Sequence, residues 1–144
     1  MKKIIALTLA LVLALGLIAC GSATSQPPAE TKAKNADIVA YVEKNKETLL
    51  SAMEQSFATS SGMTCTSDIK VEGMGFVISI NINELDEIDD ATKAVLQQTY
   101  DAMGDTFNAS LDTMKTELAS LEYYQVLVCE KDGDVLATIT AGNK

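Results

Sequence analysis

The hydrophobic and polar positions of this chain follow a helical period in some stretches and an extended period in others. Over residues 36–59, apolar side chains recur every three or four positions, which is the spacing of one helix face. Asn35, just before this stretch, is the expected N-cap of the helix. The apolar positions are Ile38, Val42, Leu49, Met53 and Phe57.

Two stretches of alternating polarity come next. In Met63 to Glu72 the even positions are polar, and in Phe76 to Asn83 the apolar side chains fall on every second residue. Alternation at a period of two is typical of strands with one buried face. Gly73-Met74-Gly75 lies between them and predicts a tight turn, so we expect a strand hairpin here.

The second half of the chain repeats the order of helix, strand and strand. An apolar stripe from Asp89 to Ser120 runs through Gly104, which predicts one bent helix rather than two. Glycine costs up to about 1 kcal/mol relative to alanine within a helix, so we attribute Gly104 to close packing against a neighbour. Two further strands follow at Glu122 to Lys131 and Asp134 to Ala141, joined by the hairpin signal Asp-Gly. The fold class is therefore α+β.

The cysteines suggest a strand order. Cys65 begins the first strand and Cys129 is near the end of the third. A disulfide needs Cα atoms within about 7 Å, and neighbouring strands are about 4.8 Å apart. Pairing Cys65 with Cys129 therefore predicts a four-stranded antiparallel sheet of order 2-1-3-4, with two helices on one face. The order 1-2-3-4 separates the cysteines by two strand spacings, and the alternative to a bridge is two separate buried thiols.

The sequence does not decide which side chains of the third strand point toward the helices. If Cys129 faces the helices together with Cys65, then Tyr124, Val126 and Val128 face away from them. Either the far side of the sheet carries an apolar patch, which would indicate a partner surface, or the facing is reversed. A central strand with apolar residues on both faces is the simpler reading.

The first twenty residues resemble a bacterial lipoprotein signal. Lys2 and Lys3 precede an apolar run that ends on the lipobox Leu17 to Cys20. We expect cleavage before Cys20 and a diacylglyceryl group on its thiol, which anchors the protein at the outer side of the cell membrane. The alternative is a retained membrane helix, but the run of about 16 residues is shorter than the roughly 20 that span a bilayer.

The rest of the chain divides into two parts. Residues 20–35 are small, polar and rich in Pro and alternating charges, which predicts a flexible tether. Residues 36–144 are expected to form a single domain. Removal of Lys2 and Lys3 with the signal leaves 9 of the 11 lysines against 20 acidic residues, a net charge of −11. So acidic a surface argues against nucleic acid as a partner.

Candidate chemistry is sparse. The chain has no histidine, which excludes Ser-His-Asp catalysis and most zinc hydrolase schemes and leaves the cysteines without a base. The acidic run before the long helix lacks EF-hand spacing, and capping explains it without calcium. Its members are Glu84, Asp86, Glu87, Asp89 and Asp90. We predict no enzymatic activity, no metal and no cofactor.

The whole layout resembles a family of small, uncharacterised lipoproteins of Firmicutes-type bacteria, known as a domain of unknown function. A lipobox, a tether, the helix IVAYVEKNKETLLSAMEQ and a closing hairpin around KDGDV carry the resemblance, which covers residues 36–141. It implies no activity and no site residues, and the cysteine pair is not part of it.

We therefore predict a membrane-anchored, non-catalytic binding or accessory module that contacts an unidentified protein or ligand. Its predicted working surface is the helix-free face of the sheet, although such a face is by default simply solvated. The predicted residues of this surface are Thr64, Thr66, Asp68, Lys70, Ser79, Asn81 and Thr138. The alternative is a small solute- or ligand-carrying component, which requires a cavity lined by Phe76, Met103 and Phe107.

Overall fold

The computed structural model describes residues 34–85 and 88–143. The predicted signal at 1–19, the lipidation residue Cys20 and nearly all of the 20–35 tether lie outside these residues. The described elements are α2 (Ala36–Ser61), β1 (Cys65–Glu72), β2 (Gly75–Ile82), α3 (Asp90–Asp101), α4 (Gly104–Lys115), β3 (Tyr123–Glu130) and β4 (Val135–Gly142).

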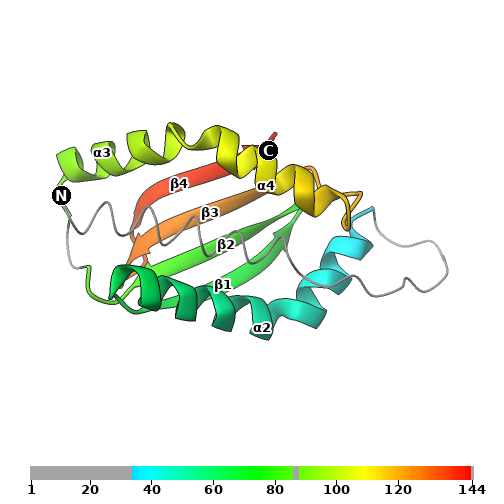
Figure 1. Ribbon diagram of the computed structural model, residues 1–144, viewed down its shortest axis with the longest axis horizontal. Helices are drawn as coiled ribbons and strands as arrows, with labels where there is room; N and C mark the ends of the chain where they lie inside the picture. The colour runs from blue at the N-terminus through cyan, green and yellow to red at the C-terminus, as the bar shows by residue number, and fades with distance from the viewer. Residues whose placement is uncertain (1–33, 86–87, 144) are drawn as a thin grey trace.

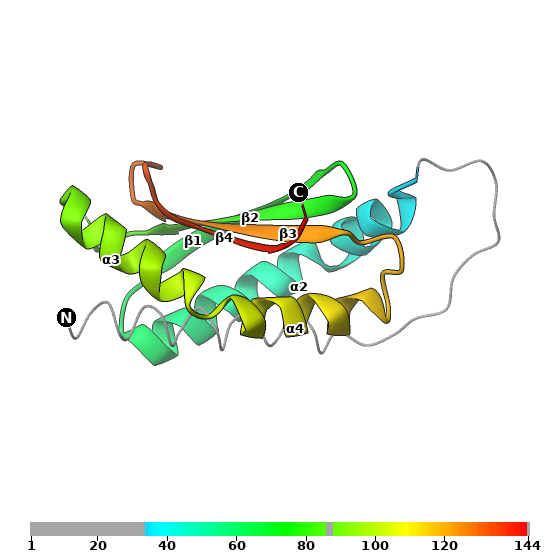
Figure 2. The same ribbon diagram turned by 90° about the horizontal axis from the view of Figure 1, so that it is seen from above.

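The four strands form one mixed sheet of order β1-β2-β3-β4. The outer pairs are antiparallel, and β2 and β3 are parallel neighbours at the centre. In Figure 1, α2 lies along the β1 side of the sheet, and α3 and α4 lie along the β4 side. Figure 2 shows α2 and α4 on one face of the sheet, with α3 continuing from α4 along the β4 edge. The predicted all-antiparallel order 2-1-3-4 with two helices is therefore wrong.

Side-chain chemistry explains why β2 and β3 take the centre. Their helix-facing positions are apolar throughout the core and almost fully buried, and their outer positions carry no charge, whereas the outer positions of β1 include the exposed, charged Asp68, Lys70 and Glu72. A strand with long apolar runs is best buried between neighbours, and a half-polar strand suits an edge. The buried positions of the central pair are Phe76, Ile78, Ile80, Ile82, Tyr124, Val126 and Val128, each at most 1 % exposed.

The structure does not join Cys65 and Cys129 by a disulfide. Both Cys65 and Cys129 are free and buried. Cys65 pairs with Ile82, a core residue of the helix-facing side, whereas Cys129 pairs with Asn81 on the opposite side. With β2 between them and their side chains on opposite faces, the two thiols cannot meet. Of the two alternatives left open for β3, the reversed facing is the correct one, because Tyr124 faces the core.

The predicted long helix breaks into α3 and α4 around Ala102 and Met103. The amide of Met103 donates to the carbonyl of Tyr100 at 3.0 Å. This bond spans three residues, as in a 3₁₀ turn, instead of the four of an α-helix, and α-helical bonding resumes at Gly104. Tyr100 and Phe107 lie on either side of the break, and each is 1 % exposed in the core. The packing reason given for Gly104 is wrong, since a Cβ there meets no atom within 4 Å.

The expected N-cap at the start of α2 differs as well. The Asn35 side chain makes no capping bond and instead donates from Nδ2 to the carbonyl of Gly73 at 2.6 Å. One residue into the helix, the Asp37 carboxylate accepts a hydrogen bond from the Ser120 hydroxyl. These contacts tie the first turn of α2 to the β1–β2 turn and to the segment that follows α4.

Gly104→Ala is expected to raise the free energy of unfolding by up to about 1 kcal/mol, because the methyl group meets open space and lowers the entropy of the unfolded chain. Gly75→Ala is the matched control. A Cβ at Gly75 would lie 2.8 Å from Cδ1 of Tyr123 and against the Tyr123 backbone, so this variant should be destabilised by about 1–3 kcal/mol. Urea denaturation midpoints measure both; a destabilised Gly104→Ala would show that Gly104 serves packing after all.

Candidate functional site

The candidate site is the face of the sheet opposite the core, called here the outer face. Along each strand it is formed by the residues that alternate with the core positions. Among the described residues no helix or strand lies over it (Figure 2). Its members are Thr66, Asp68, Lys70 and Glu72 of β1; Gly75, Val77, Ser79 and Asn81 of β2; Tyr123, Gln125, Leu127 and Cys129 of β3; and Val135, Thr138, Thr140 and Gly142 of β4.

Charge on the outer face is confined to β1. Asp68 and Lys70 lie on this edge strand, and the outer positions of β2, β3 and β4 carry no acidic or basic side chain. Asp68 forms an ion pair with Lys46 of α2, with Oδ1 and Nζ 2.5 Å apart. The hydrogen bond from Lys46 lowers the pKa of the Asp68 carboxyl. Because this carboxylate is 67 % exposed, the pair adds at most about 1 kcal/mol to stability.

Tyr123 shapes one end of the outer face. It pairs with Gly75 of the neighbouring strand, and its hydroxyl donates to the carbonyl of Glu72 at 2.7 Å. The ring therefore lies across β2 toward β1, in the space that a side chain at Gly75 would otherwise fill. An aromatic ring over a glycine restores packing that the glycine lacks. This end of the face is closed by a fixed ring, whereas the middle of the face stays open.

The free edge of β1 is capped by α2. Glu54 accepts hydrogen bonds at 2.7 Å from both the amide and the hydroxyl of Ser67. Unpaired edge amides are the groups that recruit an additional strand. The Ser67 amide is therefore not available to pair with an added strand.

The free edge of β4 is capped in the same way by α3 and α4. Gln97 accepts from the amide of Thr138 and donates to its carbonyl, both at 2.8 Å. Asn108 accepts from the amide of Gly142 at 3.0 Å. The helices thus bond to both sheet edges as well as covering the core. The outer face is the sheet surface left for a partner.

The sequence identified most of the polar residues of this face. Thr66, Asp68, Lys70, Ser79, Asn81 and Thr138 lie on it as predicted. Thr64 precedes β1, and its amide and hydroxyl donate to the carboxylate of Glu84.

The apolar centre of the face, Val77 and Leu127, was not identified. Val77 is 9 % exposed, and Leu127 is half-buried and pairs with Ser79 across the central strands. Both residues alternate with the core residues of their strands. With the correct facing of β3, this pattern would have pointed to them.

The two thiols are poorly suited to covalent chemistry. Burial, with the nearby carboxylates of Glu54 and Glu84, raises the pKa of Cys65 to about 12. Burial and the neighbouring Asp134 raise the pKa of Cys129. The thiolate is the reactive form of cysteine, so both residues are held in the unreactive form at neutral pH.

Asp86 and Glu87 of the acidic run before α3 lie outside the described residues. Of its other members, those with assigned contacts stabilise local structure. Asp89 caps α3, accepting from the amide of Thr92 at 2.8 Å, and this bond lowers the pKa of the exposed Asp89 carboxyl. Among the described residues, no three acidic, cysteine or histidine side chains are grouped to hold a metal ion.

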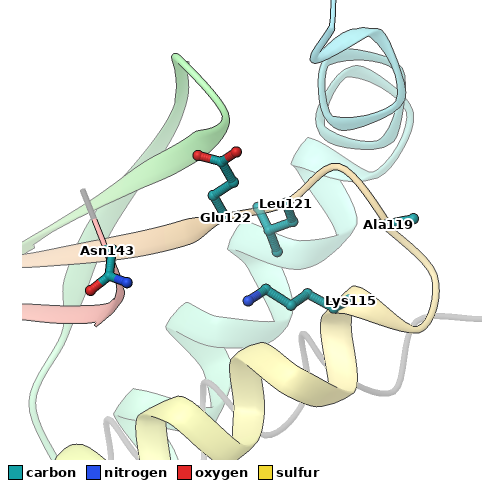
Figure 3. Close-up of a pocket in the computed structure, with 5 residues that line it drawn as sticks. All are labelled: Lys115, Ala119, Leu121, Glu122 and Asn143. Carbon is teal, nitrogen blue, oxygen red and sulfur yellow. The ribbon is translucent and has the colours of Figure 1, made fainter.

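A shallow hollow of about 430 Å³ lies at the end of the molecule where α4 and β4 end and β3 begins. In Figure 3, Lys115 reaches into it from α4, while Glu122 points away from Lys115. Its other lining residues are Ala119, Leu121 and Asn143. The residues expected to line a solute cavity do not border this hollow. Phe76 and Phe107 are each 1 % exposed in the core, with Met103 packed against them.

Comparison with known proteins returned no matching family model, no matching curated protein and no matching solved structure. Within residues 34–85 and 88–143, none of the helices is long and apolar enough to cross a membrane.

Alkylation by iodoacetamide at pH 8 tests the state of the thiols. With a pKa of about 12, Cys65 in the folded protein should react on the order of a thousandfold more slowly than in urea, where its pKa returns to about 8.5. Mass spectrometry of the digested protein reports each cysteine separately, so Cys20 does not interfere. Rapid labelling of Cys65 in the folded protein would contradict its burial.

Proposed function

We propose that this protein is a membrane-anchored extracytoplasmic lipoprotein that acts as a non-catalytic binding module, and that its binding surface is the outer face of the sheet. The observation that carries the proposal is the absence of charged side chains from the outer positions of β2, β3 and β4, in a chain with 20 acidic residues and 11 lysines. Interface cores are depleted of charged residues relative to the rest of a protein surface.

The other described surfaces support a partner less well. The exposed side of α2 carries Glu43, Lys44 and Glu47, which is typical of a solvated helix face. The edges of the sheet are bonded to Glu54 and Gln97. The middle of the outer face combines the buried Val77 and the half-buried Leu127 with uncharged polar side chains, which fits the depletion of charged residues at the centre of an interface.

Three features support a role without catalysis. The chain has no histidine, the pKa values of Cys65 and Cys129 are raised, and the carboxylates of Glu54, Glu84 and Asp89 are bonded to backbone amides. None of these groups is both free and activated, as a nucleophile or a general base must be.

Site-specific photo-crosslinking in intact cells tests the binding surface. A photoreactive residue at Ser79 or Thr138 should give crosslinked products, because both lie on the outer face. The same residue at Thr48, exposed on α2, is the matched control and should give none. Products that are equally abundant from Thr48, or no products from the outer face in a correctly localised protein, would contradict the proposal.

The anchor is tested separately in the same cells. Growth with a labelled fatty acid should label the protein, and Cys20→Ala should abolish the label. A Cys20→Ala variant that still takes up the fatty acid would contradict the lipid anchor without affecting the result for the outer face.

A further inference from the structure

The middle of the outer face has a distinctive composition. Val77 and Leu127 lie on the two central strands, and each is paired across strands with an uncharged polar residue, Gln125 or Ser79. We propose that this face packs against the same face of a second copy of the chain, forming a two-fold symmetric dimer. The inference rests on the proposed binding role of the outer face and specifies the partner.

Charge favours a second copy here and disfavours it elsewhere. Each chain carries a net charge of −9, so two copies repel when their acidic surfaces meet. On the outer face the charged residues Asp68, Lys70 and Glu72 are confined to β1 at one edge. A two-fold axis parallel to the strands and between β2 and β3 places β1 of each copy over the uncharged β4 of the other. No acidic side chain then faces an acidic side chain.

The polar side chains of the face are self-complementary. Hydroxyl and amide groups both donate and accept hydrogen bonds, so the same patch on two copies can pair with itself, as an isologous interface requires. A face of carboxylates or ammonium groups cannot do so. The uncharged polar residues of the three strands are Ser79, Asn81, Gln125, Thr138 and Thr140.

The size of the face suits a modest dimer. Four strands of eight residues each cover about 19 Å by 26 Å at ordinary strand spacing and rise. Two such faces bury about 1,000 Å², close to the lower limit for a specific interface. Two copies held at one membrane by their anchors would associate more readily than in dilute solution, because tethering raises the effective concentration.

Other partner classes fit less well. Nucleic acids and anionic lipid surfaces need clustered cations, and Lys70 is the single lysine of the outer face. Strand addition requires an open edge, whereas Ser67 and Thr138 at the two edges are bonded to helix side chains.

A charge-exchange experiment tests the dimer. Two differently tagged copies of the full chain are expressed together, membranes are solubilised in mild detergent, and recovery of one tag with the other is measured. Ser79 lies on β2 in the middle of the face, and with the axis between β2 and β3 it lies over Leu127 of the other copy. Its own counterpart is one strand spacing, about 4.8 Å, to the side, within reach of a longer charged side chain. Wild-type copies should co-purify, pairs of Ser79→Lys or of Ser79→Asp should lose most of this recovery, and Ser79→Lys mixed with Ser79→Asp should regain it.

The matched controls are Thr48→Lys and Thr48→Asp, on an exposed part of α2, which should leave recovery unchanged. Wild-type copies that fail to co-purify, or that co-purify regardless of the charges at Ser79, would overturn the dimer. If that happens while Ser79 still crosslinks to a different polypeptide in cells, the binding role of the outer face survives and only the identity of the partner is wrong.

Discussion

The parallel pairing of β2 with β3 is the interaction on which the rest of this structure depends. Their helix-facing apolar residues are each at most 1 % exposed, and their register brings Phe76 against Tyr124 and Ile78 against Val126. The rings of Phe76 and Tyr124 are stacked, with centroids 5.9 Å apart. Parallel neighbours need a long crossover, which α3 and α4 supply. Strands β1 and β4 are thereby left at the edges.

The positions of the helices follow from this sheet. Helix α2 packs on β1, whereas α3 and α4 pack on β4, so each edge has a helix side chain within reach of its free amides. Glu54, Gln97 and Asn108 make these bonds. A sheet with capped edges and one covered face offers a partner only its remaining face. The proposed binding role and the proposed dimer both derive from that geometry.

Sequence periodicity located the strands to within about two residues, since alternation is a local property of the chain. The strand order was wrong because it depended on one nonlocal assumption, that Cys65 and Cys129 are bonded. The apolar residues Tyr124, Val126 and Val128 argued against the bond, because it would turn them away from the helices. Burying these three side chains stabilises the fold far more than turning one cysteine toward the core. This comparison would have shown that Tyr124, Val126 and Val128 face the helices.

Two local features of the structure could not be predicted from the sequence. Helical spacing continues through Gly104, so it gave no sign that the helix breaks one turn after Tyr100. The edge caps depend on how α2 and α3 lie against the sheet, and nothing in the sequence pairs Glu54 with Ser67. The polar residues of the outer face were identified because they alternate with the core. Leu127, in its apolar centre, was missed because the sequence left the facing of β3 undecided.

Nuclear Overhauser effects between backbone protons of neighbouring strands test the central pairing most directly. In the structure, β2 and β3 lie in parallel register with Ile78 beside Val126, so we expect contacts between these two strands and none between β1 and β3. Contacts that place Ile69 of β1 beside Val126 instead would contradict the strand order, and with it the capped edges and the outer face.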